Sequence, residues 1–144
     1  MTFSIAETNP QSGPKVWRST GAVLLGILVG AALSLGTDQV LHVLKVYPPW
    51  GQALHDPGLN LLALSYRCVF NIVGFYGIAQ LAPRNPMRHV WVGAAIGFLL
   101  SAVGVVAALK ADLGPLWYPI ALALTTLPCG WLAGRLHRKL HVER

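Results

Sequence analysis

The sequence predicts an all-α, polytopic membrane protein whose four transmembrane helices form two helical hairpins. Of its 144 residues, 54% are hydrophobic and only 11% are charged, whereas about 25% of the residues of a soluble domain are charged. A helix needs about 20 apolar residues to cross a bilayer, and four runs with almost no charge approach or exceed that length. They leave no room for a separate soluble domain, so residues 15–136 are expected to form one transmembrane domain. The runs are Ser19–Thr37, Pro57–Pro83, Val90–Leu109 and Leu113–Gly134.

The distribution of charge predicts the orientation of these helices. The net charge of +6 resides in the N-terminal tail, the connection between the second and third runs, and the C-terminal tail, all on one side of the membrane. Because cytoplasmic loops carry an excess of lysine and arginine, both termini are expected in the cytoplasm. The expected partner of this basic chain is therefore the lipid bilayer and not a nucleic acid. The opposite connections contain Asp38, Lys45, Asp56, Lys110 and Asp112.

Both ends of the chain are expected to lie outside the membrane. Residues 1–14 are polar and contain proline and glycine without an apolar period, which predicts a disordered cytosolic tail. Residues 137–144 are expected to form a short basic cytosolic tail. The uncharged run after Arg18 is longer than the apolar core of a signal peptide, so an uncleaved anchor is favoured.

The first run carries small residues at a spacing of four, and this stripe becomes polar toward its outer end. Residues at this spacing share one helix face, and small residues let two helices approach closely. Two interpretations stay open: tight packing within one subunit, or a dimer interface. The stripe consists of Gly26, Gly30, Ser34, Asp38 and His42.

The third run repeats this pattern with Gly93, Gly97 and Ser101, each 67 residues after its counterpart. The fourth run resembles the second more weakly, and together these matches suggest a duplicated helical hairpin. Because each unit would contain two spans, the two units would be parallel and not inverted repeats.

Aromatic residues mark the expected outer membrane boundary. Tyr47 and Trp50 flank a pair of prolines in the first outer connection, and Trp117 and Tyr118 lie at the start of the fourth run. Tyrosine and tryptophan favour the membrane–water interface, which predicts an interfacial cap. A lid over a site is the alternative for the first connection, because the prolines hold the aromatic ring in place.

Arg67 is the charged residue that must lie within a membrane span. The uncharged run Cys68–Pro83 that follows it is too short to cross a bilayer alone. A charge inside a membrane helix marks a candidate functional site and needs a partner. Asp38 follows the first run at the same level, so we expect an ion pair between Arg67 and Asp38. Asn71 shares the helix face of Arg67 and His42 follows Asp38 by one turn, so both are expected to join this polar locus. Extension of Arg67 to water and lipid headgroups is the alternative.

Three further features concern single positions in the spans and between them. Pro128 removes a backbone hydrogen bond within the fourth run, which predicts a kink, with a gating hinge as the alternative. Arg84 and Arg88 in the inner connection act as an orientation signal, and contact with anionic lipid headgroups is the alternative. Cys68 and Cys129 are expected at different depths and therefore as free thiols.

Residues that would mark a catalytic or cofactor site are scarce. The histidines lie at the edges of the runs or outside them, so haem bound between the helices is not expected. Four residues near the outer surface can in principle gather around a metal, but two of them come from a loop. We therefore predict no catalytic residue, metal or cofactor. The four residues are Asp38, His42, His55 and Asp56.

Five short motifs are spread over the chain: Val46–Trp50 (VYPPW), Tyr66-Arg67, Leu81–His89 (LAPRNPMRH), Trp117–Pro119 (WYP) and Leu127–Cys129 (LPC). On these motifs the chain resembles an uncharacterised family of small four-helix bacterial inner-membrane proteins, over roughly residues 42–136. The resemblance implies a location in the bacterial inner membrane. It implies no activity and no catalytic residue.

The sequence favours a small integral membrane protein without catalytic activity, which packs against a second copy or another membrane protein through its glycine and serine faces. A small transporter or channel subunit is the alternative, motivated by the polar locus and by the Pro128 kink. A membrane-embedded enzyme with histidine and aspartate residues at its outer face is the third hypothesis.

Overall fold

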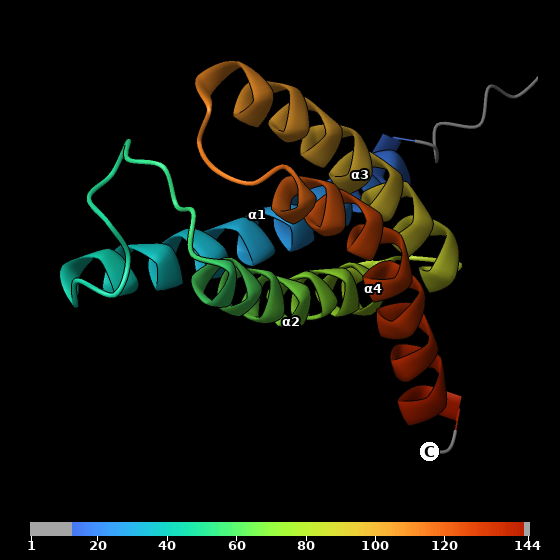
Figure 1. Cartoon of the computed structure of the whole chain (residues 1–144). Helices are drawn as coiled ribbons and strands as arrows, with labels where there is room; N and C mark the ends of the chain where they lie inside the picture. Colours follow the sequence, from blue (N-terminus) through green and yellow to red (C-terminus); the bar gives the residue numbers. More distant parts are fainter. Residues whose placement is uncertain (1–12, 143–144) are drawn as a thin grey trace, which may run out of the picture.

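The computed structural model describes residues 13–142, and these residues are all-helical in architecture, which confirms the all-α part of the predicted fold class. Four helices follow one another along the chain (Figure 1). The tail predicted as disordered lies outside the described residues up to residue 12, and α1 begins at Gly13. Helix α4 continues through most of the predicted basic tail. The helices are α1 (Gly13–Val43), α2 (Pro57–Leu81), α3 (Pro86–Ala111) and α4 (Trp117–Val142).

Three of the four described helices are long and apolar enough to cross a membrane, judged by length and composition: α1 from Lys15 onward, α2 and α3. The sequence predicts a fourth span in α4, but α4 is not among the three. Its first turn is Trp117-Tyr118-Pro119, and two threonines and Pro128 follow in its middle. These residues lower its mean hydropathy, although no charge interrupts the helix before Arg135.

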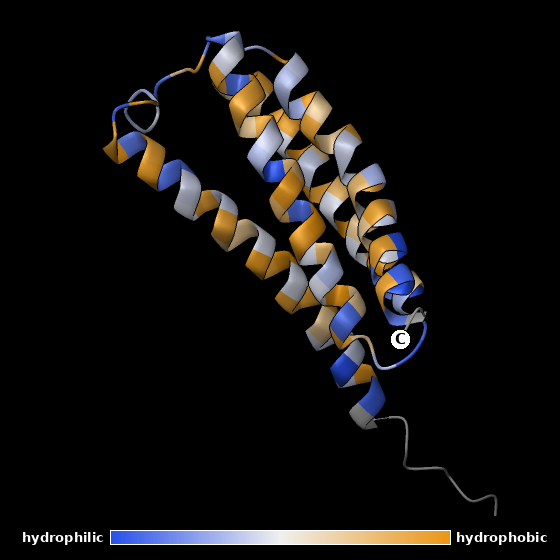
Figure 2. Cartoon of the chain, turned by 90° about the horizontal axis from the view of Figure 1, so that it is seen from below, coloured by the Kyte–Doolittle hydropathy of each residue, from blue (hydrophilic) through white to orange (hydrophobic). Residues whose placement is uncertain are grey.

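The lateral surfaces of the helices are apolar. Leu28, Leu99 and Val103 are 63%, 64% and 68% exposed, and many other aliphatic side chains are exposed as well. Figure 2 shows apolar residues along most of the length of the helices. Because extended apolar surfaces of this kind mark membrane or protein contacts, the exposed surface fits contact with lipid.

Local signals in the sequence fix the ends of α2 and the start of α3. The Asp56 carboxylate accepts a hydrogen bond from the Leu59 N–H at 2.9 Å, and Pro57 occupies the first turn, where its missing N–H costs nothing. Helix α2 ends before Pro83, and α3 begins with Pro86. The connection between them is short, which makes α2 and α3 antiparallel.

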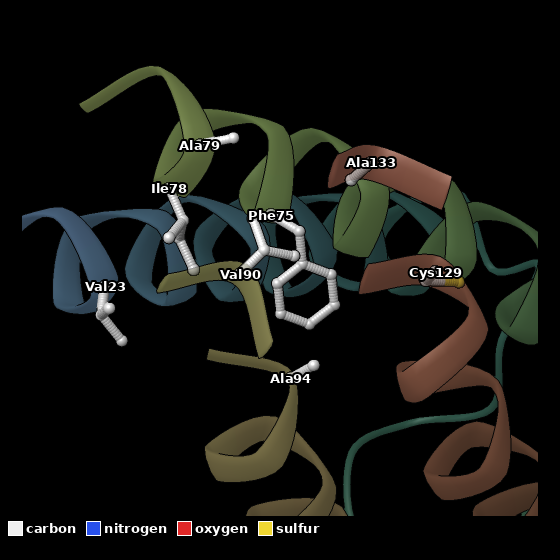
Figure 3. Close-up of a cluster of buried hydrophobic side chains, with 8 residues drawn as sticks. All are labelled: Val23, Phe75, Ile78, Ala79, Val90, Ala94, Cys129 and Ala133. Carbon is white, nitrogen blue, oxygen red and sulfur yellow. The ribbon is translucent and has the colours of Figure 1, made fainter. Parts of the chain in front are cut away.

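The helices pack around an apolar core near the α2–α3 connection, a region called the α2–α3 end below. Ile78 and Val90 are fully buried there, and Ala94 and Ala133 are fully buried beside them. All four helices contribute to this core (Figure 3). The core residues are Val23, Phe75, Ile78, Ala79, Val90, Ala94, Cys129 and Ala133.

Glycines bring α1 and α2 into backbone contact. A Cβ atom at Gly26 would lie 2.6 Å from the Gly74 carbonyl oxygen, and a Cβ atom at Gly74 would lie 2.6 Å from the Gly26 carbonyl oxygen. At Gly30 the nearest atom is the Phe70 carbonyl oxygen, 3.3 Å away. This part of the stripe therefore packs within one chain, where only a hydrogen atom fits between the helices.

The third helix also places its small residues against neighbouring helices, but they meet side chains and not backbone. A Cβ atom at Gly93 would lie 2.5 Å from the Ile78 side chain, and one at Gly97 would lie 3.2 Å from the Thr126 side chain. The α3 stripe thus faces α2 and α4.

The opposite end of the bundle, called the loop end below, contains the connections 44–56 and 112–116. Toward this end α1 diverges from the other three helices (Figure 2). The two connections touch, because the Leu54 N–H donates to the Leu113 carbonyl at 3.0 Å. Gly114 has φ +140, and a Cβ atom there would lie 2.5 Å from the Leu54 carbonyl oxygen, so glycine is needed at this contact.

Cys68 and Cys129 are free, as predicted, but the expectation that they lie at different depths is wrong. Cys68 packs against the core cluster that contains Cys129, and the two thiols are neighbours. The error arises because the depth of Cys68 was inferred from an outer membrane boundary expected near Arg67, whereas α2 already begins at Pro57. Each cysteine therefore lies about three turns into its helix.

Candidate functional site

An ion pair between α1 and α2 forms the centre of the candidate site. Asp38, near the C-terminal end of α1, accepts a hydrogen bond from Nη2 of Arg67. The second carboxylate oxygen of Asp38 accepts from the Tyr66 hydroxyl. Asp38 is only 4% exposed, so its charge is engaged by these two neighbours. The structure thus brings together the two charges that the sequence predicts to pair.

Two more tyrosines extend this network to other elements. Nη1 of Arg67 donates to the hydroxyl of Tyr118, in the first turn of α4, at 2.5 Å. The Tyr47 hydroxyl, from the α1–α2 connection, lies 3.4 Å from the Tyr66 hydroxyl and donates to the Leu59 carbonyl at 3.3 Å. Burial raises the pKa of Tyr47 above its ordinary value, so this hydroxyl stays protonated. The network joins α1, α2, α4 and the connection 44–56.

The two members of the ion pair differ in exposure. The side chain of Arg67 is 25% exposed and that of Asp38 only 6%. Nε of Arg67 is buried and has no acceptor among residues 13–142. Tyr118 accepts from Arg67, which leaves its own hydroxyl proton free to donate elsewhere. The accessible face of the ion pair therefore presents hydrogen-bond donors and not the carboxylate.

The ion pair lies in the wall of a cavity of about 570 Å³ at the loop end. All four helices and both connections of that end contribute to the wall, and the volume falls within the usual range of small-molecule sites. Most of the wall is leucine, proline, alanine and glycine, so the polar groups are few and concentrated. The polar lining residues are Asp38, His42, Tyr47, Gln52, Asn60, Arg67, Ser101 and Tyr118.

A second cavity, of about 370 Å³, lies deeper between the helices. It reaches Gly26 and Gly74, where α1 and α2 meet. Arg67 and Ser101 line both cavities. Arg67 thus stands at the junction between a cavity at the loop end and one that extends toward the α2–α3 end.

The α1–α2 connection covers part of the first cavity with aromatic side chains. The His42 ring stacks on the Trp50 ring, with centroids 4.0 Å apart and planes 2° from parallel. The His42 Nδ1–H donates to the Asp38 carbonyl at 2.7 Å, and Trp50 Nε1 donates to Gln39 Oε1 at 3.1 Å. Trp50 is 59% exposed and lines the cavity. Because the ring is both exposed and part of the cavity wall, the two alternatives from the sequence both stay open: an interfacial aromatic residue and a cover for a site.

The other predicted site residues divide between packing and the cavities. Asn71, predicted to join the ion pair, makes no hydrogen bond to it and lines the second cavity. Ser34 donates to the Gly30 carbonyl at 2.9 Å and lines the same cavity. Ser101, predicted as a packing residue, lines both cavities. Trp117 makes an edge contact with Tyr118, with centroids 6.2 Å apart.

Pro128 lies inside α4, which continues past it without a break in helical structure. Pro128 has no N–H to donate to the Leu124 carbonyl, and the hydroxyls of the two nearby threonines do not replace this donor. Thr125 and Thr126 donate to the Leu122 carbonyl at 3.1 and 3.0 Å. A helical threonine side chain reaches back by three or four residues, which places both hydroxyls on this one acceptor.

Sequence reasoning missed three members of the network. The sequence pattern gives Tyr66 no role and places Tyr47 and Tyr118 only at the membrane interface. All three adjoin the membrane level that the sequence predicts for Asp38 and Arg67, and this level was the available signal. Their contacts also depend on the rotation of each helix and on the path of the α1–α2 connection.

Among residues 13–142, no group of three or more histidine, cysteine, aspartate or glutamate side chains is arranged to hold a metal ion. Asp56, a member of the metal set considered from the sequence, caps α2 instead. No family model matches the chain, and no curated protein or solved structure matches it either. The chemistry of the site must therefore be inferred from its hydrogen-bond donors, its buried ion pair and its apolar wall.

Proposed function

We propose that the chain is a four-span protein of the bacterial inner membrane with both termini in the cytoplasm. Three apolar helices and their exposed aliphatic surfaces support membrane insertion. The described arginine and lysine residues outside Arg67, Lys45 and Lys110 all lie at the α2–α3 end or in the adjoining helix termini, which supports the orientation. Helix α4 begins and ends at about the same membrane levels as α2, so we include α4 as the fourth span.

We further propose that the protein binds a small amphipathic ligand in the cavity at the loop end, without catalysing a reaction on it. The observation that carries this proposal is the partial exposure of the Arg67 side chain, 25%, in the wall of a largely apolar cavity of about 570 Å³, whereas the Asp38 side chain in the same wall is only 6% exposed. A membrane protein that only needed to neutralise Arg67 would not require a cavity in front of the pair.

The donors in the wall indicate which ligand group they would bind. Arg67 has five N–H donors and no acceptor, and Tyr118 has one free hydroxyl proton. A carboxylate or phosphate oxygen can accept from both, and hydrogen bonds to a charged group contribute about 1.5–3 kcal/mol each. The remaining wall, including Leu100 and Leu122, would contact an apolar body. The expected ligand is therefore an oxyanion attached to a hydrocarbon chain or ring.

Self-association through glycine faces receives less support than ligand binding. Gly26, Gly30 and Gly74 make their close contacts within one chain, so this part of the predicted interface is occupied. Partners of another kind would have to bind elsewhere on the bundle.

Transport is a second candidate function, and the adjoining positions of the two cavities favour it. Arg67 and Ser101 line both cavities, so a ligand bound at the loop end would have a route toward the second cavity. Retention of the ligand without flux into proteoliposomes would reject transport and leave binding in place.

Native mass spectrometry of the detergent-purified full chain tests the binding proposal with dodecanoate, dodecyl phosphate and dodecanol as probes. One equivalent of either anionic probe should bind, whereas dodecanol should bind at least about ten-fold more weakly, because it lacks the charged acceptor. Comparing the two anions distinguishes a carboxylate site from a phosphate site.

Two glycine variants provide a matched control for the cavity. Gly104 lines the cavity, and no neighbouring atom lies within 4 Å of the position that a Cβ atom would take there, so Gly104→Phe should fill the cavity without touching the ion pair. Gly36 also has open space but lies outside the cavity wall. Equal binding of dodecanoate and dodecanol, or equal effects of Gly104→Phe and Gly36→Phe, would contradict the proposal.

A further inference from the structure

A third cavity, of about 560 Å³, lies at the α2–α3 end between the beginning of α1 and the beginning of α3. It is separate from the ligand cavity, because the two share no lining residue. Its rim contains Arg84, Arg88 and His89, which come from the α2–α3 connection and the first turn of α3. The beginning of α1 contributes the hydroxyls of Ser19 and Thr20.

The positive charge at this rim is not neutralised within the described chain. Arg84 and Arg88 are exposed and have no carboxylate partner among residues 13–142, where the ion pair at Asp38 is the one salt bridge. The other two described acidic residues, Asp56 and Asp112, lie at the loop end. The rim therefore attracts an anion.

The start of α3 adds to this attraction. Asn85 precedes the helix, and its side chain makes no capping hydrogen bond. His89 Nδ1 donates back to the Asn85 carbonyl at 3.2 Å. No side chain caps the positive end of the α3 dipole, which faces the rim. The dipole therefore adds to the positive charge of the two arginines.

Beyond this basic rim the cavity becomes apolar. Val23 and Leu24 of α1 face it from one side, and Val92 and Ile96 of α3 face it from the other. Leu24 and Val92 are 54% and 48% exposed, so the apolar wall continues onto the lateral surface of the bundle. An anionic group at the rim would therefore be followed by hydrocarbon along α1 and α3.

We infer that this cavity is a binding site for an anionic phospholipid of the cytoplasmic leaflet. The phosphate contacts Arg84, Arg88 and the hydroxyls of α1, and an acyl chain lies along the apolar wall. A soluble phosphate would use the rim alone, whereas a lipid uses the rim and the wall, which is why the lipid is the occupant that fits. The inference rests on the proposed orientation in the membrane and is independent of any ligand at the loop end.

The experiment measures lipid binding to the detergent-purified full chain by native mass spectrometry, with dioleoyl-phosphatidylglycerol and dioleoyl-phosphatidylcholine as probes. Phosphatidylglycerol should bind more tightly, and the difference should fall as salt is raised. Arg88→Gln should weaken phosphatidylglycerol binding about five-fold, the effect expected for one basic residue near an anionic lipid. Arg138→Gln removes the same charge from α4, away from the cavity, and should leave binding unchanged. Equal losses in the two variants would overturn the inference.

A second pair of variants leaves all charges in place and so preserves the orientation signal. Thr20→Trp adds bulk in the cavity and should abolish tight binding of phosphatidylglycerol. Gly21→Trp adds the same ring at the next position, which is outside the lining and has open space around it, and binding should persist. Glycerophosphoglycerol, the headgroup without acyl chains, should not compete. Competition by this headgroup, or identical binding in the two tryptophan variants, would reject a lipid site.

Discussion

The two ends of this bundle are built from different interactions. At the α2–α3 end, glycines bring backbones into contact, and Ile78 and Val90 are fully buried. At the loop end, a polar network spans the helices and a cavity of about 570 Å³ separates them. Small residues allow helix backbones to approach closely, whereas polar side chains join helices through hydrogen bonds. The difference indicates that close helix packing is concentrated at the α2–α3 end, whereas the loop end holds the polar cavity that all four helices line.

The first test of this comparison is whether the two ends face opposite sides of the membrane, and its expected effect is all-or-none. A reporter fused after Glu143 should read as cytoplasmic, and one inserted near Gln52 as periplasmic, because Lys and Arg concentrate at the α2–α3 end. Enzymatic reporters that are active on only one side of the membrane make the measurement. The reverse pattern would invalidate the assignment of the loop end to the outer face.

The next largest effect is expected from bulk at the tight α1–α2 contact. Gly74→Leu should lower the free energy of unfolding by about 3 kcal/mol, because a side chain there meets the Gly26 backbone and forces the helices apart. Gly77→Leu is the control, since Gly77 lies on the same helix with open space around it. Unfolding in mixed micelles gives both values, and equal losses would show that the contact is not tight.

A smaller effect is expected from the ion pair at the loop end. Asp38→Asn and Arg67→Gln should each destabilise the protein by about 2 kcal/mol, because each leaves a charged partner without its hydrogen bonds. The double variant should lose less than the sum of the two. Additive losses in this double-mutant cycle would show that Arg67 and Asp38 do not stabilise each other.

The smallest effect concerns His137, near the end of α4. Burial, reinforced by the neighbouring His141, lowers the pKa of His137 below its ordinary value of about 6.5. The unfolded chain therefore binds the proton more readily, so stability should be complete above about pH 6.5 and should decrease as the pH falls through the lowered pKa. Melting temperatures measured between about pH 7 and 5 should show a shallower decrease in His137→Gln than in the control His55→Gln.

Much of the fold could be predicted from the sequence because hydropathy and charge act over whole segments. The uncharged runs predict the helices, and the glycine spacing predicts which face of α1 meets another helix. The Asp38–Arg67 pair could be predicted from the sequence because both charges adjoin the same expected membrane boundary. These inferences depend on position along the membrane normal, which the sequence specifies well.

The rest depends on rotation and tilt, which no single segment specifies. Tyr66 joins the ion pair only because α2 turns its hydroxyl toward Asp38, and Tyr118 only because α4 turns its hydroxyl toward Arg67. Asn71 shares a face with Arg67, but it lines the second cavity and makes no hydrogen bond to the ion pair. The neighbouring positions of Cys68 and Cys129 depend on where each helix begins. Tertiary packing decides all of these contacts.

The ion pair also has a consequence for the insertion of the chain into the membrane. A lone arginine in α2 would oppose entry into the lipid phase, at a cost of up to about 2.5–3.5 kcal/mol at the centre of a bilayer. Asp38 is synthesised before Arg67, so its carboxylate is already present when α2 emerges from the ribosome. Helices α1 and α2 are therefore expected to leave the translocation channel together, as a pair whose opposite charges compensate each other before either helix meets lipid alone.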